Sequence, residues 1–338
     1  MEINGRTGFF CLIGSPVGHS GSPAMYNYSF QKTEQDYVYL AFDVDLDKTE
    51  EAVSALKALG CKGFNVTMPC KTKVAELADE LSDAAELIGA CNTVVVKDGK
   101  LHGHNTDGIG FVRNLKEHGA DVKDKVITVM GAGGAATAIQ VQAALEGAKK
   151  IYIFNCKDKF YANAENTARK IENKVPDVTV EVYPLEDSQK LYEKIKESDI
   201  LVNATKSGMK PAEDESLIKD VSVFQPDFVV ADAVYNPRET KLIREAKAAG
   251  CKIALGGIGM LLWQGEAAFR IFTGESMLRR KCMKDFFEDK EKRIPGNMEY
   301  DIEQIRNELG KGMNIEKIAE KLNLDQAYVE FLFWFGIL

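Results

Sequence analysis

The chain has 338 residues, of which 45% are hydrophobic and 28% charged, and its formal net charge is −8. This length and composition predict a globular protein with room for two domains, and the negative charge argues against a nucleic-acid-binding surface. Seven cysteines without a C-x-x-C pair argue against a disulfide framework and a zinc site. Neither a signal peptide nor an apolar run of roughly 18 residues, as a membrane helix needs, is evident. We therefore expect a cytoplasmic protein that holds no metal and binds no membrane.

The N-terminal third begins with a strand and a serine-rich loop. The apolar run at residues 9–13 predicts a strand that ends at Gly14. In the following loop, Ser20 and Ser22 are two hydroxyls separated by one glycine. They could bind one small anion together, or Ser22 could cap the helix that Pro23 favours. The residues alone do not decide between these two roles.

Residues 63–71 combine a strand end, a proline turn and a lysine. Val66 continues a strand-like run that Pro69 cannot extend, because proline lacks the N–H of a β-ladder. Lys71 should therefore lie just past a strand, beside a helix over residues 73–81. There it could take and give a proton, or it could be a solvated lysine. The other elements predicted in this third are a strand at 37–42, a helix at 49–59, an Asp-Gly hairpin at 92–103 and a connecting helix at 108–118.

From residue 126 the pattern is typical of a dinucleotide-binding fold. An apolar strand at 126–130 runs into Gly-Ala-Gly-Gly-Ala-Ala at 131–136, followed by a helix to residue 145. In this setting G-x-G-x-x-A predicts a pyrophosphate at the helix N-terminus, and the next strand, 151–154, should end at the adenosine ribose. The later alternation of strands and helices predicts a doubly wound parallel sheet. The strands are expected at 178–182, 200–203 and 229–231, and the helices at 187–198, 242–249 and 260–273.

Several segments, taken in order, resemble the shikimate/quinate dehydrogenase family. They are residues 15–23, 63–71, 89–93, 103–108, 131–136, 203–209, 235–237 and 259–265. The resemblance runs from about residue 8 to about residue 278. It implies an α/β protein with a doubly wound Rossmann-type sheet and a discontinuous α/β substrate domain. The implied reaction is reversible oxidation of shikimate to 3-dehydroshikimate, of quinate to 3-dehydroquinate, or of both, with hydride transfer to NAD(P).

The resemblance also assigns roles to individual residues. Lys71 and Asp107 match the catalytic pair, with Lys71 as the base in alcohol oxidation and Asp107 orienting it. Ser20 and Ser22 would hold the substrate carboxylate. The other implied substrate contacts are Thr67, Asn92 and Gln264 for the ring hydroxyls, together with Tyr235. Without the resemblance, Gln264 reads as a polar residue at the edge of a packed helix.

The cofactor preference depends on the end of the strand at 151–154. NADP-specific family members place Asn-Arg-Thr there, and the arginine grips the 2′-phosphate. Here Cys156 stands in place of the arginine, and Asp158 would repel a phosphate while accepting bonds from ribose hydroxyls. Lys157 leaves partial tolerance for phosphate, so we predict NAD as the preferred cofactor and NADP as the alternative. The implied cofactor-binding residues are Ala132, Gly133, Gly134, Ala135, Asn155, Cys156, Lys157, Asp158, Lys206, Ala233, Val234, Asn236 and Gly257.

The predicted domains are a substrate domain at 1–107 and 256–293, a dinucleotide-binding domain at 108–255 and a helical extension at 294–338. Short helices are expected in the extension at 299–309, 315–322 and 326–335, spaced as in a helix-turn-helix. From residue 297 onward there are four basic and eight acidic residues, which argues against DNA binding. We expect the apolar last helix to pack on the enzyme or on a second subunit, as in a homodimer.

Three alternatives remain open at this stage. The substrate could be shikimate, quinate or another cyclic polyol acid. The chain could also be a metabolite sensor that uses the extension as its output, although the retained Lys71, Asp107 and glycine loop favour an enzyme. Finally, Cys70 and Cys91 flank Lys71 and Asn92, so they could be oxidation-sensitive or could be small packing residues.

Overall fold

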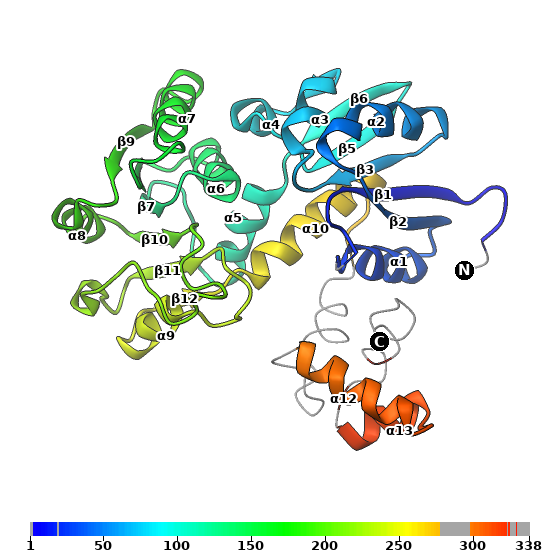
Figure 1. The fold of residues 1–338 in the computed structure, drawn as a ribbon. Helices are drawn as coiled ribbons and strands as arrows, with labels where there is room; N and C mark the ends of the chain where they lie inside the picture. The colour runs from blue at the N-terminus through cyan, green and yellow to red at the C-terminus, as the bar shows by residue number, and fades with distance from the viewer. Residues whose placement is uncertain (1–2, 19, 278–297, 323, 325–328, 330–338) are drawn as a thin grey trace. The chain divides into compact units, whose positions relative to one another are not determined.

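The computed structural model describes residues 3–18, 20–277, 298–322, 324 and 329. The chain divides into two compact units, Met1–Met277 and Leu278–Leu338. The first unit contains two six-stranded sheets, one built before residue 105 and one built after residue 125 (Figure 1). Among the described helices, none has the length and apolarity that crossing a membrane requires.

The first sheet is mixed and has the strand order β2-β1-β3-β5-β6-β4. β1 pairs in parallel with both β2 and β3, whereas β5 is antiparallel to both β3 and β6. The predicted hairpin is confirmed, because Asp98 and Gly99 both have positive φ, of 51° and 75°, between β5 and β6. The strands are β1 Gly8–Gly14, β2 Tyr37–Asp43, β3 Gly63–Val66, β4 Glu80–Leu81, β5 Thr93–Lys97 and β6 Lys100–His104. The helices of this part are α1 Ser22–Lys32, α2 Thr49–Ala58, α3 Lys71–Leu77 and α4 Asp83–Ile88, with a 3-10 turn η1 at Leu46–Lys48.

The second sheet is entirely parallel and has the order β12-β11-β10-β7-β8-β9. From β7, the strands β8 and β9 are added on one side and β10, β11 and β12 on the other. This change of side at β7 confirms the predicted doubly wound Rossmann-type sheet. The strands are β7 Val126–Met130, β8 Lys150–Asn155, β9 Thr179–Pro184, β10 Ile200–Asn203, β11 Val229–Asp232 and β12 Ile253–Leu255. The helices are α6 Gly134–Leu145, α7 Tyr161–Lys174, α8 Ser188–Lys196 and α9 Lys241–Ala248, with a 3-10 turn η2 at Val221–Val223.

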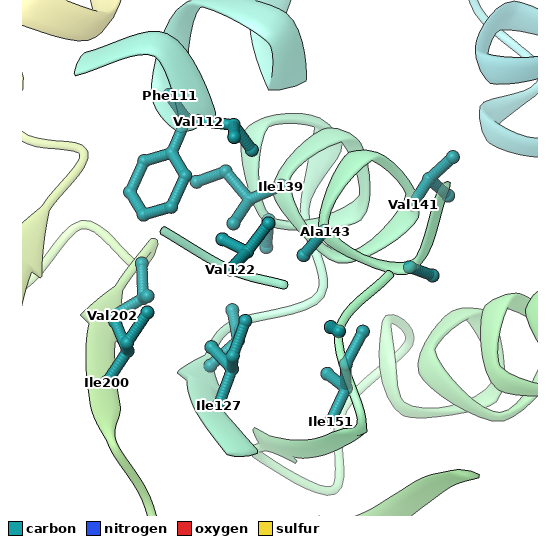
Figure 2. Close-up of a cluster of buried hydrophobic side chains, with 14 of the residues drawn as sticks. Phe111, Val112, Val122, Ile127, Ile139, Val141, Ala143, Ile151, Ile200 and Val202 are labelled. Carbon is teal, nitrogen blue, oxygen red and sulfur yellow. The ribbon is translucent and has the colours of Figure 1, made fainter. Parts of the chain in front are cut away.

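Buried aliphatic side chains hold α6 against the central strands of this sheet. Ile139 of α6 lies above Ile127 and Val202, and Figure 2 shows these side chains pointing toward one another. Helix α5, Asp107–Glu117, adds Phe111 and Val112 to the same cluster. Because strands of a parallel sheet are covered on both faces, their residues form continuous apolar runs, which is why the sequence identifies them readily.

Helix α5 also packs closely on α10, Ile258–Thr273, and the two lie side by side in Figure 1. Two glycines permit this approach. A Cβ added to Gly110 would lie 2.5 Å from the carbonyl oxygen of Met260, and one added to Gly259 would lie 1.9 Å from Oδ1 of Asn114. The close crossing brings the middle of α10 to the first turn of α5.

The second unit contains α12, Met298–Gly310, and α13, Ile315–Leu322, so the first two helices predicted in the extension are confirmed. They share a small core that includes Ile305 and Ile318. The predicted helix at 326–335 lies outside the described residues, apart from Val329. The predicted domain boundaries remain predictions.

One predicted helix is wrong in its bounds. The expectation was a helix at 73–81, but α3 starts at Lys71 and ends at Leu77. Asp79 then pairs with Leu101 on β6, donating its N–H to the Leu101 carbonyl at 2.9 Å and accepting from Leu101 N at 2.7 Å. This pairing with a distant strand ends the helix, and β4 follows.

Candidate active site

Polar residues gather where β1, β3 and β6 end and β5 begins. β1 and β3 are parallel, so the loops that follow them adjoin, and Ser15 N donates to the Met68 carbonyl at 2.9 Å. β5 runs the opposite way, so Asn92, just before it, lies at the same edge and donates its N–H to the His104 carbonyl at 3.0 Å. This edge of the first sheet therefore collects residues that are far apart in the chain.

Lys71 and Asp107 form an ion pair at this edge. Lys71 Nζ lies 2.6 Å from Asp107 Oδ2, with the two side chains 28% and 19% exposed. Each is the first residue of a helix, α3 and α5 respectively. A helix N-terminus favours an anion, so Asp107 is well placed there, whereas Lys71 depends on the carboxylate for its stabilisation. The ammonium has three donors, so two remain for a ligand.

Asn92 holds the other oxygen of the carboxylate. Its Nδ2 donates to Asp107 Oδ1 at 2.8 Å, and its Oδ1 accepts from Thr106 N at 2.9 Å. Thr106 Oγ1 lies 3.4 Å from Gln264 Oε1 of α10. The structure thus brings four of the sequence-identified residues together: Lys71, Asp107, Asn92 and Gln264.

Two further residues support this cluster from behind. Buried Asn65 donates through Nδ2 to the Asn92 carbonyl at 3.1 Å and to Thr93 Oγ1 at 3.0 Å. Tyr39 OH donates to Asn65 Oδ1 at 2.7 Å, and burial, with smaller contributions from neighbouring groups, raises the pKa of Tyr39 well above its usual value. The hydroxyl therefore remains a donor. Sequence reasoning assigned no role to Tyr39 or Thr106, because their partners lie in other segments of the chain.

The remaining predicted substrate residues lie outside this hydrogen-bonded cluster. Ser22 is the first residue of α1, and Gly21 occupies the N-cap position without a side-chain cap, so the capping role considered for Ser22 is wrong. Ser20 Oγ accepts from Ser22 N at 3.2 Å. Thr67 directly follows β3, with its N–H donating to the Ile13 carbonyl at 2.9 Å. Tyr235 is 50% exposed, on the loop after β11.

The glycine-rich turn after β7 forms an open cradle. Gly131 has φ of +120°, and a Cβ there would lie 2.7 Å from the carbonyl oxygen of Ala204, so the turn requires glycine. In contrast, a Cβ on Gly133 or Gly134 would meet no atom within 4 Å. Gly134 begins α6, which has no side-chain cap. Its first N–H groups are therefore available to an anion, and this fits a dinucleotide pyrophosphate.

The end of β8 carries the residues expected to face the ribose. Asn155 Nδ2 donates to Asp158 Oδ1 at 3.1 Å, and Phe160 N donates to the same oxygen at 2.8 Å, so the carboxylate is fixed. Cys156 is exposed, and desolvation, with Glu186 and Asp158, raises the pKa of its thiol. The two carboxylates thus make the surroundings of Cys156 negative. Lys157 is exposed and donates its N–H to Glu186 Oε1 at 3.2 Å.

The loops after β11 and β12 are in direct backbone contact. Gly257 N donates to the Val234 carbonyl at 2.9 Å. A Cβ on Gly257 would lie 2.2 Å from the carbonyl oxygen of Ala233, so this position also requires glycine. The structure therefore joins Ala233, Val234 and Gly257, while Asn236 is exposed further along the loop after β11 and Lys206 is exposed on the loop after β10.

The two cysteines beside the ion pair are buried. Cys70 Sγ donates to the Val44 carbonyl at 3.3 Å and lies 3.1 Å from Thr49 Oγ1. Burial raises the pKa of the Cys91 thiol to about 12, so its thiolate is scarce at neutral pH. These observations favour the packing role over oxidation sensitivity.

Comparison with known proteins assigns the family. The shikimate dehydrogenase substrate binding domain matches residues 12–94, and the shikimate 5'-dehydrogenase C-terminal domain matches residues 257–285. The shikimate dehydrogenase (NADP(+)) of Streptococcus uberis is 50% identical over 278 residues, which cover 82% of this chain and 94% of that protein. The chain belongs to the shikimate dehydrogenase family.

Solved structures of this family have the same fold. The shikimate 5-dehydrogenase of Listeria monocytogenes, in complex with shikimate and NAD, superposes with a TM-score of 0.83 at 47% identity, covering 85% of this chain and 99% of that one. The quinate dehydrogenase of Corynebacterium glutamicum, in complex with NAD, gives 0.73 at 32% identity, covering 82% and 98%. Both shikimate dehydrogenases and quinate dehydrogenases are therefore among the structural relatives. The family relationship confirms a nicotinamide dinucleotide as the cofactor class.

Proposed function

We propose that this protein catalyses the reversible, NAD(P)-dependent oxidation of shikimate to 3-dehydroshikimate. The observation that carries the proposal is the ion pair of Lys71 and Asp107, with Nζ and Oδ2 2.6 Å apart and Asn92 on the other carboxylate oxygen. A relative that is 50% identical bears the name of this activity, and a structural relative binds shikimate together with NAD.

Oxidation of a secondary alcohol removes a hydride from carbon and a proton from the hydroxyl. A bound dinucleotide supplies the hydride acceptor, so the protein must provide position and proton transfer. In its neutral amine form, Lys71 receives the hydroxyl proton at Nζ in oxidation, and in its ammonium form it returns that proton in reduction. Asp107 holds Nζ in place, Asn92 holds Asp107, and Thr106 in turn holds Asn92. The acceptor nitrogen is thereby fixed before the substrate arrives.

Substrate recognition would involve the residues around this pair. Asn92, Thr67 and Gln264 bind ring hydroxyls in the proposed complex, and Ser20 with Ser22 binds the carboxylate. Sites that hydrogen-bond a substrate hydroxyl reject analogues without it strongly, because buried polar groups are left unpaired. Tyr235 lies on the loop after β11, whereas most of the other proposed substrate residues lie at the edge of the first sheet. Tyr235 would therefore contact the substrate only when this loop and the first sheet approach the same ligand.

The test is the initial rate of dinucleotide reduction with shikimate and with quinate, each with NAD and with NADP. We expect turnover with shikimate and at least one dinucleotide. Turnover with quinate alone would move the assignment to the quinate-oxidising relatives. The absence of turnover in all four pairings would contradict the proposal and leave the sensor hypothesis in its place.

For the dinucleotide, we propose a preference for NAD over NADP, although several relatives are named for NADP. The support is the negative surroundings of Cys156, where Asp158 and Glu186 both act on the thiol. A 2′-phosphate there would face like charges without an arginine to bind it.

The double variant Cys156→Arg/Asp158→Ser is expected to shift the ratio of kcat/KM toward NADP by about 10²-fold, because it adds a phosphate-binding fork and removes a like charge. Steady-state kinetics with both dinucleotides measures the ratio. Asp177→Ser is the control, because Asp177 is an exposed carboxylate that precedes β9. It therefore lies at the edge of the sheet opposite to the edge where Cys156 and Asp158 follow β8. An unchanged ratio in the double variant, or a wild-type ratio that already favours NADP, would contradict the proposal.

A further inference from the structure

A buried carboxylate lies at the end of β11. Asp232 is 2% exposed and accepts three hydrogen bonds: from Thr240 Oγ1 at 2.6 Å, from Val234 N at 2.9 Å and from Asn203 Nδ2 at 3.0 Å. All three donors are neutral. Burial raises the pKa of Asp232, and the three hydrogen bonds oppose this. Among the described residues, no lysine or arginine forms an ion pair with Asp232, and a buried carboxylate without a cation is a poor source of stability.

The partners of Asp232 belong to different loops. Asn203 ends β10, and its side chain also accepts from Thr205 N at 3.1 Å and donates to the Ser207 carbonyl at 3.1 Å. Thr240 immediately precedes α9. One carboxylate therefore connects the loop after β10, the loop after β11 and the start of α9.

The connection continues to β12. Val234, which donates its N–H to Asp232, accepts through its carbonyl from Gly257 N at 2.9 Å. β10, β11 and β12 are neighbours in the parallel sheet, so their carboxyl ends lie in a row (Figure 1). The first of these loops also contacts the glycine cradle, because a Cβ on Gly131 would lie 2.7 Å from the Ala204 carbonyl oxygen. Backbones this close cannot shift independently.

We propose that Asp232, with Asn203 and Thr240, is a positioning cluster that fixes the loop at 233–236 for the nicotinamide half of the cofactor. The inference rests on the proposed function and on the family resemblance, which assigns Ala233, Val234 and Gly257 to the cofactor. The adenosine half is served by other residues, those after β7 and β8. Loss of the cluster should therefore weaken the nicotinamide end of the binding site selectively.

The test compares Thr240→Val with Thr128→Val. Both threonines are fully buried in the same part of the fold, and both lose one hydroxyl hydrogen bond without a change in volume. Thr240 donates to Asp232, whereas Thr128, in the middle of β7, bonds Ser198 Oγ at 2.8 Å, away from the loops. The two ligands are the reduced dinucleotide that wild type binds more tightly and the matching ADP-ribose, which lacks the nicotinamide.

We expect Thr240→Val to raise the dissociation constant of the reduced dinucleotide about 10-fold, which corresponds to the loss of one hydrogen bond to a charged group. Its affinity for ADP-ribose should stay within about 2-fold, and Thr128→Val should change neither affinity beyond that margin. In turnover assays of Thr240→Val, the KM for the dinucleotide should rise and the KM for shikimate should stay unchanged. Equal weakening of both ligands, or no weakening of either, would overturn the inference.

Two further variants separate positioning from charge. Asp232→Asn keeps the shape: its Oδ1 can accept from Asn203 and Val234, and its Nδ2 can donate to the Thr240 hydroxyl. It should bind the dinucleotide at least about 5-fold more tightly than Asp232→Ala, which loses all three bonds. Equal defects in the two variants would count against positioning by hydrogen bonds.

The binding measurements contain no shikimate, so a wild-type protein that binds the dinucleotide without turning over substrate would refute the proposed reaction and leave this inference testable. A wild-type protein that binds neither ligand would overturn both.

Discussion

Replacing Lys71 with alanine is expected to lower kcat for shikimate oxidation by about 10²–10⁴-fold, the range typical of a lost general base. The variant removes the nitrogen that lies 2.6 Å from Asp107 Oδ2 and leaves the carboxylate bonded to Asn92. Dinucleotide affinity should be unchanged, because the glycine cradle after β7 belongs to the second sheet. Stopped-flow absorbance at saturating substrate measures the chemical step directly.

Lys73→Ala is the matched control, since Lys73 lies on the same helix two residues further on. Its Nζ makes longer ion pairs, 3.5 Å to Glu76 and 3.7 Å to Glu50, which are weak because Lys73 is half-buried and both glutamates are exposed. We expect its kcat to stay within about 2-fold of wild type, as for most surface substitutions. If Lys71→Ala kept more than a tenth of the wild-type kcat, Lys71 would not be the base, and Asp107 would be the next candidate.

The elements that the sequence predicted well are those whose signal is local. The parallel strands form unbroken apolar runs, and the turn at Asp98 and Gly99 depends on residues that tolerate positive φ. Helix α7 was not predicted, because its buried face consists mainly of small and polar residues, such as Ala164, Thr167 and Ala168. Ile171 is the only large apolar side chain among its buried residues, so large apolar residues do not mark the helical period.

Distant pairings explain what the sequence could not predict. Helix α3 ends at Leu77 because Asp79 pairs with Leu101, a residue on another strand. The cluster around Asp232 is of the same kind, since Asn203 and Thr240 join it only after the sheet has formed. The pairing of Lys71 with Asp107 was anticipated through the family resemblance, whereas residues 71 and 107 by themselves gave no sign that they would be neighbours.

Replacing Gly110 with alanine is expected to reduce the free energy of unfolding by about 2 kcal/mol, within the range for overpacked interfaces. The new Cβ would lie 2.5 Å from the Met260 carbonyl oxygen and 2.6 Å from Gln264 N. Both are backbone atoms, so α5 and α10 must separate, and the gain of about 1 kcal/mol in helix propensity cannot offset this. Thermal unfolding should show a decrease in Tm of about 3 °C.

Gly265→Ala provides the comparison, because it adds the same methyl group to the interior of α10. There the nearest atom is Met25 Cε at 2.6 Å, the tip of a flexible side chain that can move aside. We expect its stability to stay within about 1 kcal/mol of wild type, since helix propensity favours alanine. A similar loss in both variants would show that Gly110 has no special steric role.

The Gly110→Ala variant also tests whether the packing of α5 on α10 affects the active site. Gln264 lies 3.4 Å from Thr106 Oγ1 only because α10 approaches the first turn of α5, and Thr106 in turn bonds Asn92. Separation of the helices by Gly110→Ala should therefore move Gln264 away from the proposed ring-hydroxyl site. The KM for shikimate should rise more than the KM for the dinucleotide when both are measured well below the unfolding temperature. Equal changes in the two constants would indicate a general loss of folded protein, and the helix crossing would then have no particular part in substrate recognition.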